Sequence, residues 1–134
     1  MNSRLSIPMF ASRVPAGFPS PAQDYVEESL DLNQLCIQHP TATYFVRASG
    51  ESMLDAGIHN NDVLVVDRSI TARHGDIVVA SLDHSFTVKQ LETSPTLRLM
   101  PMNKDSEYYR PLDINDGIEF EIFGVVSFVV HALR

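Results

Sequence analysis

The 134-residue sequence has little of several residue types that mark whole classes of protein. It contains a single cysteine, Cys36, and no tryptophan. A lone cysteine cannot form an internal disulfide, and it offers neither a zinc-binding cluster nor a redox pair. We therefore expect Cys36 to be a small buried hydrophobic residue in a reducing compartment. A chain of this length can build its core without a disulfide or a structural metal.

Long apolar runs and basic clusters are also missing. A bilayer-spanning helix needs about 20 apolar residues, and the longest candidate, residues 122–133, is interrupted by Ser127 and His131. Pro8 cuts the short N-terminal apolar run before it resembles a signal peptide. Ten basic residues against 17 acidic ones leave a net charge of −7. We expect a cytoplasmic protein with no membrane contact and no direct binding to duplex DNA, which usually requires clustered Lys and Arg.

Charge and proline are unevenly distributed along the chain. Residues 1–23 contain Arg4 and Arg13, no acidic residue and four of the eight prolines. Prolines disfavour helix and push the residues before them toward extended conformations. The sequence therefore predicts an extended N-terminal arm over residues 1–23 and a single β-rich domain over residues 24–134. The arm is too short for a helix-turn-helix domain.

The remaining pattern predicts one helix followed by strands. Val26 and Leu30 are four residues apart, as on one face of a helix, and acidic residues stand near the start of the segment, where a helix favours them. This pattern indicates a short helix over residues 24–37. Asp83 and His84 separate two β-rich runs closely enough for a hairpin, although the turn has no glycine. We expect a mainly β fold, a curved and mostly antiparallel β domain with one short N-terminal helix. The predicted strands are residues 43–48, 62–67, 76–82, 85–91, 96–100 and 118–132.

Common catalytic signatures are absent. Ser49, Ser52 and Ser69 stand near turn residues, but none lies in the Gly-x-Ser-x-Gly elbow of the α/β-hydrolases. None of the histidines forms a His-Glu-x-x-His zinc motif, so no metal and no cofactor is expected. The histidines are His39, His59, His74, His84 and His131.

Lysine is scarce, which makes its positions informative. Lys104 lies in a polar loop, whereas Lys89 lies in a predicted strand with Thr87 and Leu91 on its own face. Lys89 is either an edge-strand lysine in water or a buried amine. An exposed lysine is neutral in about one molecule in 2,500 at pH 7, and a general base needs a pKa near roughly 7–8, which burial can provide. The two interpretations make opposite claims about the solvation of the Lys89 amine.

Several segments match a known family in order along the chain. They are GFPSPA (17–22), DYVE (24–27), LDLNQL (30–35), ASGESM (48–53), FTVK (86–89) and FGVV (123–126). The sequence resembles the LexA/UmuD family of self-cleaving Ser-Lys peptidases over nearly all of the chain after the first dozen or so residues. The resemblance implies that Ser52 is the nucleophile and Lys89 the general base, and that the bond cut is Ala16–Gly17. The flanking prolines favour the extended form that a protease binds.

The resemblance also implies partners. A RecA filament on single-stranded DNA would stimulate cleavage in the SOS response. The shortened protein would then act as a homodimer and as the accessory subunit of a UmuC-like, error-prone translesion DNA polymerase.

Two other functions remain open from the sequence. One is a non-catalytic dimeric module of the same fold that regulates a DNA polymerase, and an exposed Lys89 far from Ser52 would favour it. The other is a general peptidase related to signal peptidases, but such an enzyme needs a membrane anchor or an apolar insertion surface.

Overall fold

The computed structural model describes residues 5, 7–10, 12–21, 27–105 and 107–134. The chain divides into two compact units, residues 1–38 and 39–134. In the first unit, β1 (Ile7–Phe10) pairs antiparallel with β2 (Glu27–Leu30), and α1 (Leu32–Cys36) follows. The predicted arm boundary, 23/24, falls inside the first unit, where a strand within the predicted arm pairs with a strand beyond it.

The helix is shorter than the sequence pattern predicts. Residues 27–30 belong to β2, and α1 begins only after Asp31, whose carboxylate accepts a hydrogen bond of 2.9 Å from the Asn33 N–H. Residues 24–26 of the predicted helix lie outside the described residues. Pairing with β1 satisfies the backbone of residues 27–30, so this non-local contact overrides their helical spacing.

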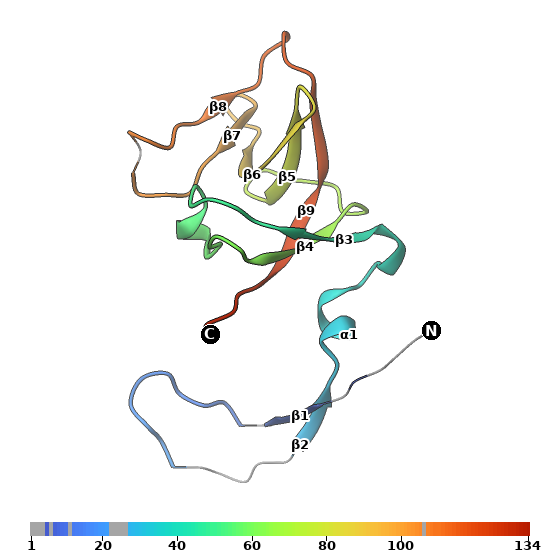
Figure 1. Ribbon diagram of the computed structural model, residues 1–134, viewed down its shortest axis with the longest axis vertical. Helices are drawn as coiled ribbons and strands as arrows, with labels where there is room; N and C mark the ends of the chain where they lie inside the picture. Colours follow the sequence, from blue (N-terminus) through green and yellow to red (C-terminus); the bar gives the residue numbers. More distant parts are fainter. Residues whose placement is uncertain (1–4, 6, 11, 22–26, 106) are drawn as a thin grey trace. The chain divides into compact units, whose positions relative to one another are not determined.

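The second unit is built on a seven-stranded sheet in the order β3-β4-β9-β5-β6-β7-β8, and every neighbouring pair is antiparallel. Figure 1 shows β9, in red, running between β4 and β5. The predicted mainly β, antiparallel fold is confirmed, with a short β8 that the sequence pattern did not indicate. The elements of this unit are η1 (Pro40–Ala42), β3 (Thr43–Arg47), η2 (Leu54–Ala56), β4 (Val63–Asp67), β5 (Ile77–Leu82), β6 (Ser85–Glu92), β7 (Arg98–Met100), β8 (Leu112–Asp113) and β9 (Phe120–Val130).

The central strand β9 is irregular at two places. The register with β4 skips Ser127, and the register with β5 skips Phe123. Extra residues of this kind bend a strand and increase its twist, so we expect β9 to bend at both places. Gly124 lies beside the second irregularity, where an added Cβ would stand 2.7 Å from Val66 Cγ1. Only glycine fits this close approach of β9 to β4.

The hairpin between β5 and β6 forms without glycine. Asp83 and His84 both adopt positive φ angles, 47° and 70°, as a two-residue hairpin turn requires. Backbone and side chain of Asp83 together fix the turn, since its N–H donates to the Glu119 carbonyl and its carboxylate accepts from the Glu119 N–H. The predicted hairpin is confirmed.

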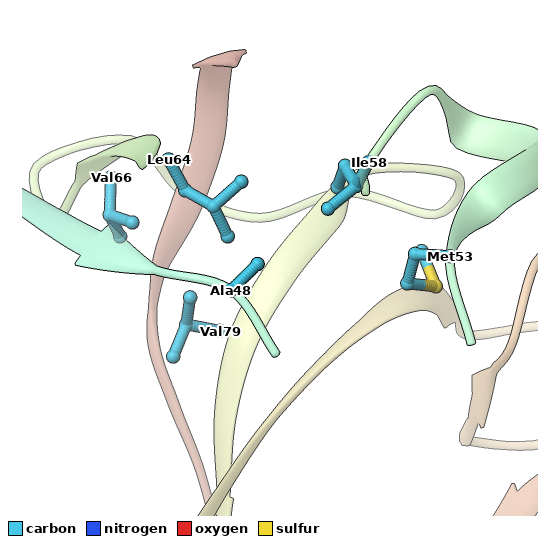
Figure 2. Close-up of a cluster of buried hydrophobic side chains, with 6 residues drawn as sticks. All are labelled: Ala48, Met53, Ile58, Leu64, Val66 and Val79. Atoms are coloured by element: carbon cyan, nitrogen blue, oxygen red, sulfur yellow. The ribbon is translucent and has the colours of Figure 1, made fainter. Parts of the chain in front are cut away.

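The interior of the second unit consists of two hydrophobic clusters. Adjacent residues of β5 divide between them, Val79 entering the first and Val78 and Ala80 the second, because successive strand residues point to opposite faces. Both faces of β5 are therefore covered. Among the described residues, no helix has the length and apolarity needed to cross a bilayer. The first cluster, drawn in Figure 2, contains Ala48, Met53, Ile58, Leu64, Val66 and Val79, and the second contains Val78, Ala80, Leu91, Leu99 and Val125.

Candidate active site

Ser52 lies in the loop of residues 48–53 between β3 and η2, and the two ends of this loop are buried. Ala48 is 6% exposed and Met53 is 3% exposed, and both belong to the first hydrophobic cluster (Figure 2). Gly50 takes a φ of 85°, which favours glycine, and its N–H donates to Asn60 Oδ1 at 2.9 Å. The loop is thus tied to the core at both ends and to a neighbouring turn in its middle.

A second segment braces the same loop from another side. The Met102 N–H donates to the Ser52 carbonyl at 2.8 Å, and the Asn103 side-chain amide donates to the Glu51 carbonyl at 2.7 Å. These bonds fix the backbone on both sides of the Ser52 Cα. The Ser52 hydroxyl therefore starts from a well-defined position.

The Lys89 amine meets the Ser52 hydroxyl. The distance from Nζ to Ser52 Oγ is 3.2 Å, to Thr87 Oγ1 2.8 Å and to the Val88 carbonyl oxygen 3.1 Å. Lys89 stands on β6, which lies between β5 and β7, and its side chain is partly buried. The interpretation of Lys89 as an edge lysine facing water therefore does not hold.

Burial also shifts the protonation equilibrium of this amine toward its neutral form. Desolvation lowers the pKa of Lys89 below its ordinary value of 10.5. Among the described residues, its hydrogen-bond partners are two hydroxyls and a carbonyl, all uncharged. No carboxylate among them offsets the loss of hydration, so the site favours the neutral amine more than water does.

The hydrogen-bonding capacity of a neutral amine matches this environment. Such an amine has two N–H donors and one lone pair. The carbonyl of Val88 and the hydroxyl of Thr87 can accept the two N–H groups, which leaves the lone pair for the Ser52 hydroxyl. In that arrangement the Ser52 proton points at a base, which is the geometry that nucleophile activation requires.

A cleft of about 300 Å³ opens in front of the two side chains. Its walls come from β3, the Ser52 loop, β5 and β6, so a bound peptide would reach both the hydroxyl and the amine. Apart from Ser52 and Lys89, the lining includes Arg47, Ser49, Met53, Ile58 and Phe86.

The other candidates from the sequence lie elsewhere or have structural roles. Ala16 and Gly17 are exposed in the connection between β1 and β2, within the first unit. Ser69 donates to the buried Asp67 carboxylate at 2.6 Å, and Lys104 is exposed. Ser49 lines the cleft, but its side chain makes no hydrogen bond with Lys89 among the described residues. Of the three serines, only Ser52 contacts the amine.

The structure also brings together residues that sequence spacing could not connect. His131 and Asp62 are 69 positions apart, and their side chains are hydrogen-bonded. His59 stands beside both. Thr87, in contrast, was within reach of sequence reasoning, since residues two apart on a strand share a face.

Comparison with known proteins gives the same family as the sequence motifs. Residues 8–127 match the Peptidase S24-like family. Protein MucA of Salmonella typhimurium is 54% identical over 122 residues, which cover 91% of this chain and 82% of that protein. Protein ImpA of Shigella flexneri is 53% identical over 127 residues, covering 95% and 85%.

A more distant relative extends the comparison. The LexA repressor of Verminephrobacter eiseniae is 40% identical over 114 residues, which cover 84% of this chain and 49% of the repressor. The resemblance expected from the motifs is confirmed by these matches. The chain belongs to the Peptidase S24-like family, and within it to the UmuD-like proteins.

Proposed function

We propose that this protein is a serine peptidase that cleaves its own Ala16–Gly17 bond with a Ser52–Lys89 dyad. The observation that carries the proposal is the 3.2 Å approach of the desolvated Lys89 amine to the Ser52 hydroxyl. Membership of a peptidase family and similarity to a LexA repressor support it. The exposed Ala16–Gly17 bond between β1 and β2 is accessible for cleavage.

The reaction follows from the chemistry of the two side chains. The neutral Lys89 amine takes the proton from Ser52 as its Oγ bonds to the Ala16 carbonyl carbon. Lys89 then gives the proton to the Gly17 nitrogen as the C–N bond breaks, and water hydrolyses the acyl-enzyme. The Gly50 N–H is already bonded to Asn60, so the oxyanion would be stabilised by later N–H groups of the same turn.

The biological role that we propose follows the UmuD-like relatives. A RecA filament on single-stranded DNA would stimulate the cleavage during the SOS response. The shortened homodimer would then serve a UmuC-like translesion polymerase as an accessory subunit in the cytoplasm. Similarity to MucA and ImpA supports this assignment. Cleavage within one chain and cleavage between two chains are both compatible with it.

The decisive experiment is incubation of the purified chain at alkaline pH, followed by intact-mass measurement. A lysine deprotonates there without help, so we expect a new species beginning at Gly17. Ser52→Ala and Lys89→Ala should abolish it. The matched control is Lys104→Ala, at the other lysine, which is exposed and lies outside the cleft, and it should cleave like the unmodified protein.

A parallel incubation at neutral pH, with a RecA filament on single-stranded DNA, tests the proposed stimulation. Cleavage that persists in Ser52→Ala would refute the proposed nucleophile. An unchanged mass of the unmodified protein under both conditions would leave the non-catalytic interaction module as the better assignment.

A further inference from the structure

Three side chains outside the Ser52–Lys89 cleft converge on one point. His131 Nδ1 lies 2.5 Å from Asp62 Oδ1, and His59 Nδ1 lies 3.6 Å from Asp62 Oδ2. The two imidazole rings lie face to face, with centroids 4.4 Å apart and a tilt of 31°. One ligand atom from each residue falls within 4.8 Å of the other two.

The backbone sets up this convergence. Val63 and Val130 are register partners of β4 and β9, so the residues that continue each strand, Asp62 and His131, face each other at its end. A tight turn adds the third residue, because the Asp62 N–H donates to the His59 carbonyl at 3.1 Å and the His59 N–H donates to Asp62 Oδ2 at 2.7 Å. Strand pairing and a hydrogen-bonded turn therefore preorganise all three residues.

The cluster combines a buried acid with open imidazoles. The Asp62 side chain is 2% exposed, whereas His59 and His131 are 49% and 37% exposed. The carboxylate is thus held in place, and the two rings leave a side open to solvent. An ion could enter from that side and keep a water molecule in its remaining coordination position.

We propose that His59, Asp62 and His131 bind one Zn²⁺ ion per chain. Two imidazole nitrogens and a carboxylate oxygen, completed by water, are a common zinc ligand set, with bonds of about 2.0–2.2 Å and hence ligand atoms about 3.3 Å apart. The His131–Asp62 and His59–Asp62 distances lie on either side of that spacing, so binding requires a small opening of the first pair and a small closing of the second. Mg²⁺ and Ca²⁺ fit poorly because they prefer oxygen ligands. The proposal replaces the sequence-based expectation that the protein binds no metal.

The ion would also stiffen the support of the Ser52 loop. The Asp62 carbonyl accepts from the Ala48 N–H at 2.8 Å, and the Ala48 carbonyl accepts from the Asn61 N–H at 2.9 Å. Ala48 is the buried start of that loop. Zinc bound to Asp62 therefore stabilises the folded state in the region next to the proposed nucleophile, and it raises the melting temperature by mass action.

The test is calorimetric titration of the untagged, metal-stripped full chain with Zn²⁺. We expect one ion per chain, and we expect His59→Ala and His131→Ala each to weaken binding by about tenfold or more. The matched control is His84→Ala, because His84 lies 3.0 Å from Glu119 and forms a surface histidine–carboxylate pair outside the cluster. It should bind like the unmodified chain, and Mg²⁺ should produce no saturable heat.

A second readout uses only the unmodified chain. Co²⁺ added to the metal-stripped protein should give a visible absorption band, as Co²⁺ does in a four-coordinate site of nitrogen and oxygen ligands. Zn²⁺ should displace the Co²⁺ and abolish this band. Thermal melts without metal show whether each variant is folded. Absence of both a stoichiometric Zn²⁺ isotherm and the Co²⁺ band in the unmodified protein would overturn the proposal, as would equal weakening by His84→Ala. Neither readout involves cleavage, so this test and that of the dyad fail independently.

Discussion

Thr87 and Lys89 stand on one face of β6, and the Thr87 Oγ1 lies 2.8 Å from the Lys89 Nζ. It is shorter than the hydrogen bonds from the same amine to the Ser52 hydroxyl and the Val88 carbonyl. A hydroxyl two residues away on the same strand is fixed by the backbone itself. In the proposed reaction, Thr87 would therefore orient the amine toward Ser52 without taking part in any bond change.

Thr87→Val should slow self-cleavage by about three- to tenfold, since an ordinary hydrogen bond contributes about 0.5–1.5 kcal/mol. Thr87→Ser keeps the hydroxyl and should retain most of the rate. Rates are measured by intact mass over time at a fixed alkaline pH. Thr96→Val, at an exposed loop position, is the control. A Thr87→Val variant that cleaves as fast as the unmodified protein would contradict the positioning role.

The pH dependence of cleavage should report the Lys89 amine. Because only the neutral amine accepts a proton, the rate should rise about tenfold per pH unit below its pKa and level off above it. Burial lowers that pKa from 10.5, so the plateau should begin below pH 10.5. A rate that keeps rising through pH 10.5 would indicate a fully hydrated amine or attack by hydroxide. Lys89→Arg should be inactive because guanidinium stays protonated.

The same desolvation should lower the free energy of unfolding, because the charged Lys89 amine is less well solvated in the folded chain. The pKa of Lys89 is lower in the folded chain than its ordinary 10.5, so protonation favours the unfolded state. This cost is fully present below the folded pKa and disappears as the pH approaches 10.5. Lys89→Met should therefore raise the melting temperature at pH 7, and the gain should shrink toward pH 10.5.

Thermal melts at several pH values measure this difference. Lys104→Met, at an exposed lysine, should leave the melting temperature unchanged at every pH. A gain for Lys89→Met that is the same at pH 7 and pH 10.5 would show that packing and not charge is responsible.

Gly124→Ala should destabilise the second unit by about 1–3 kcal/mol, the usual range for overpacking. The added Cβ would stand 2.7 Å from Val66 Cγ1 and 3.1 Å from the Asp67 carbonyl oxygen, and the backbone cannot move away easily. Denaturant unfolding measures the loss. Gly117→Ala is the control, since its nearest neighbour, Asn115 Oδ1, is 3.7 Å away. Equal stability of the two variants would show that β9 can shift at this point.

Cleavage at Ala16–Gly17 would separate β1 from β2 without touching the core. Their four-residue ladder is short, β1 is exposed, and an isolated two-stranded pairing is marginal in water. We expect residues 1–16 to dissociate and residues 17–134 to melt cooperatively, because both hydrophobic clusters lie in residues 39–134. Size-exclusion chromatography with mass detection and thermal melting check this. Co-elution of the two pieces, or loss of a cooperative melt, would contradict it.

The strands of the second unit were predictable because their signals are local. Runs of β-branched residues between turn residues locate six of its strands to within a few positions, and the Asp83-His84 spacing indicates the hairpin. The β1–β2 pair was not predictable, since it joins segments on both sides of a proline-rich stretch. The helical spacing of residues 24–37 therefore gave a wrong prediction for residues 27–30, which form β2.

The candidate site likewise has parts that local sequence patterns predict and parts that only the tertiary structure shows. Family motifs pointed to Ser52 and Lys89, and the strand period placed Thr87 beside the lysine. The scarcity of lysine drew attention to Lys89, but its burial depends on β7 and β5 flanking β6, which no local pattern gives. The cluster of His59, Asp62 and His131 depends on the register of β4 with β9. No local sequence motif predicts a contact between residues 69 positions apart, such as Asp62 and His131.

Ala48 and Met53 anchor the loop that carries the proposed nucleophile in the same hydrophobic cluster that joins β4 to β5. Interiors are packed too tightly to absorb a change of volume without movement, and misalignment of reacting groups by about 1 Å can slow a reaction 100-fold. Conservative substitutions deep in this cluster should therefore leave the fold intact and yet displace the Ser52 hydroxyl enough to change the rate of the proposed cleavage. Selection on the rate of the proposed self-cleavage would then act on buried aliphatic residues that never contact the Ala16–Gly17 bond.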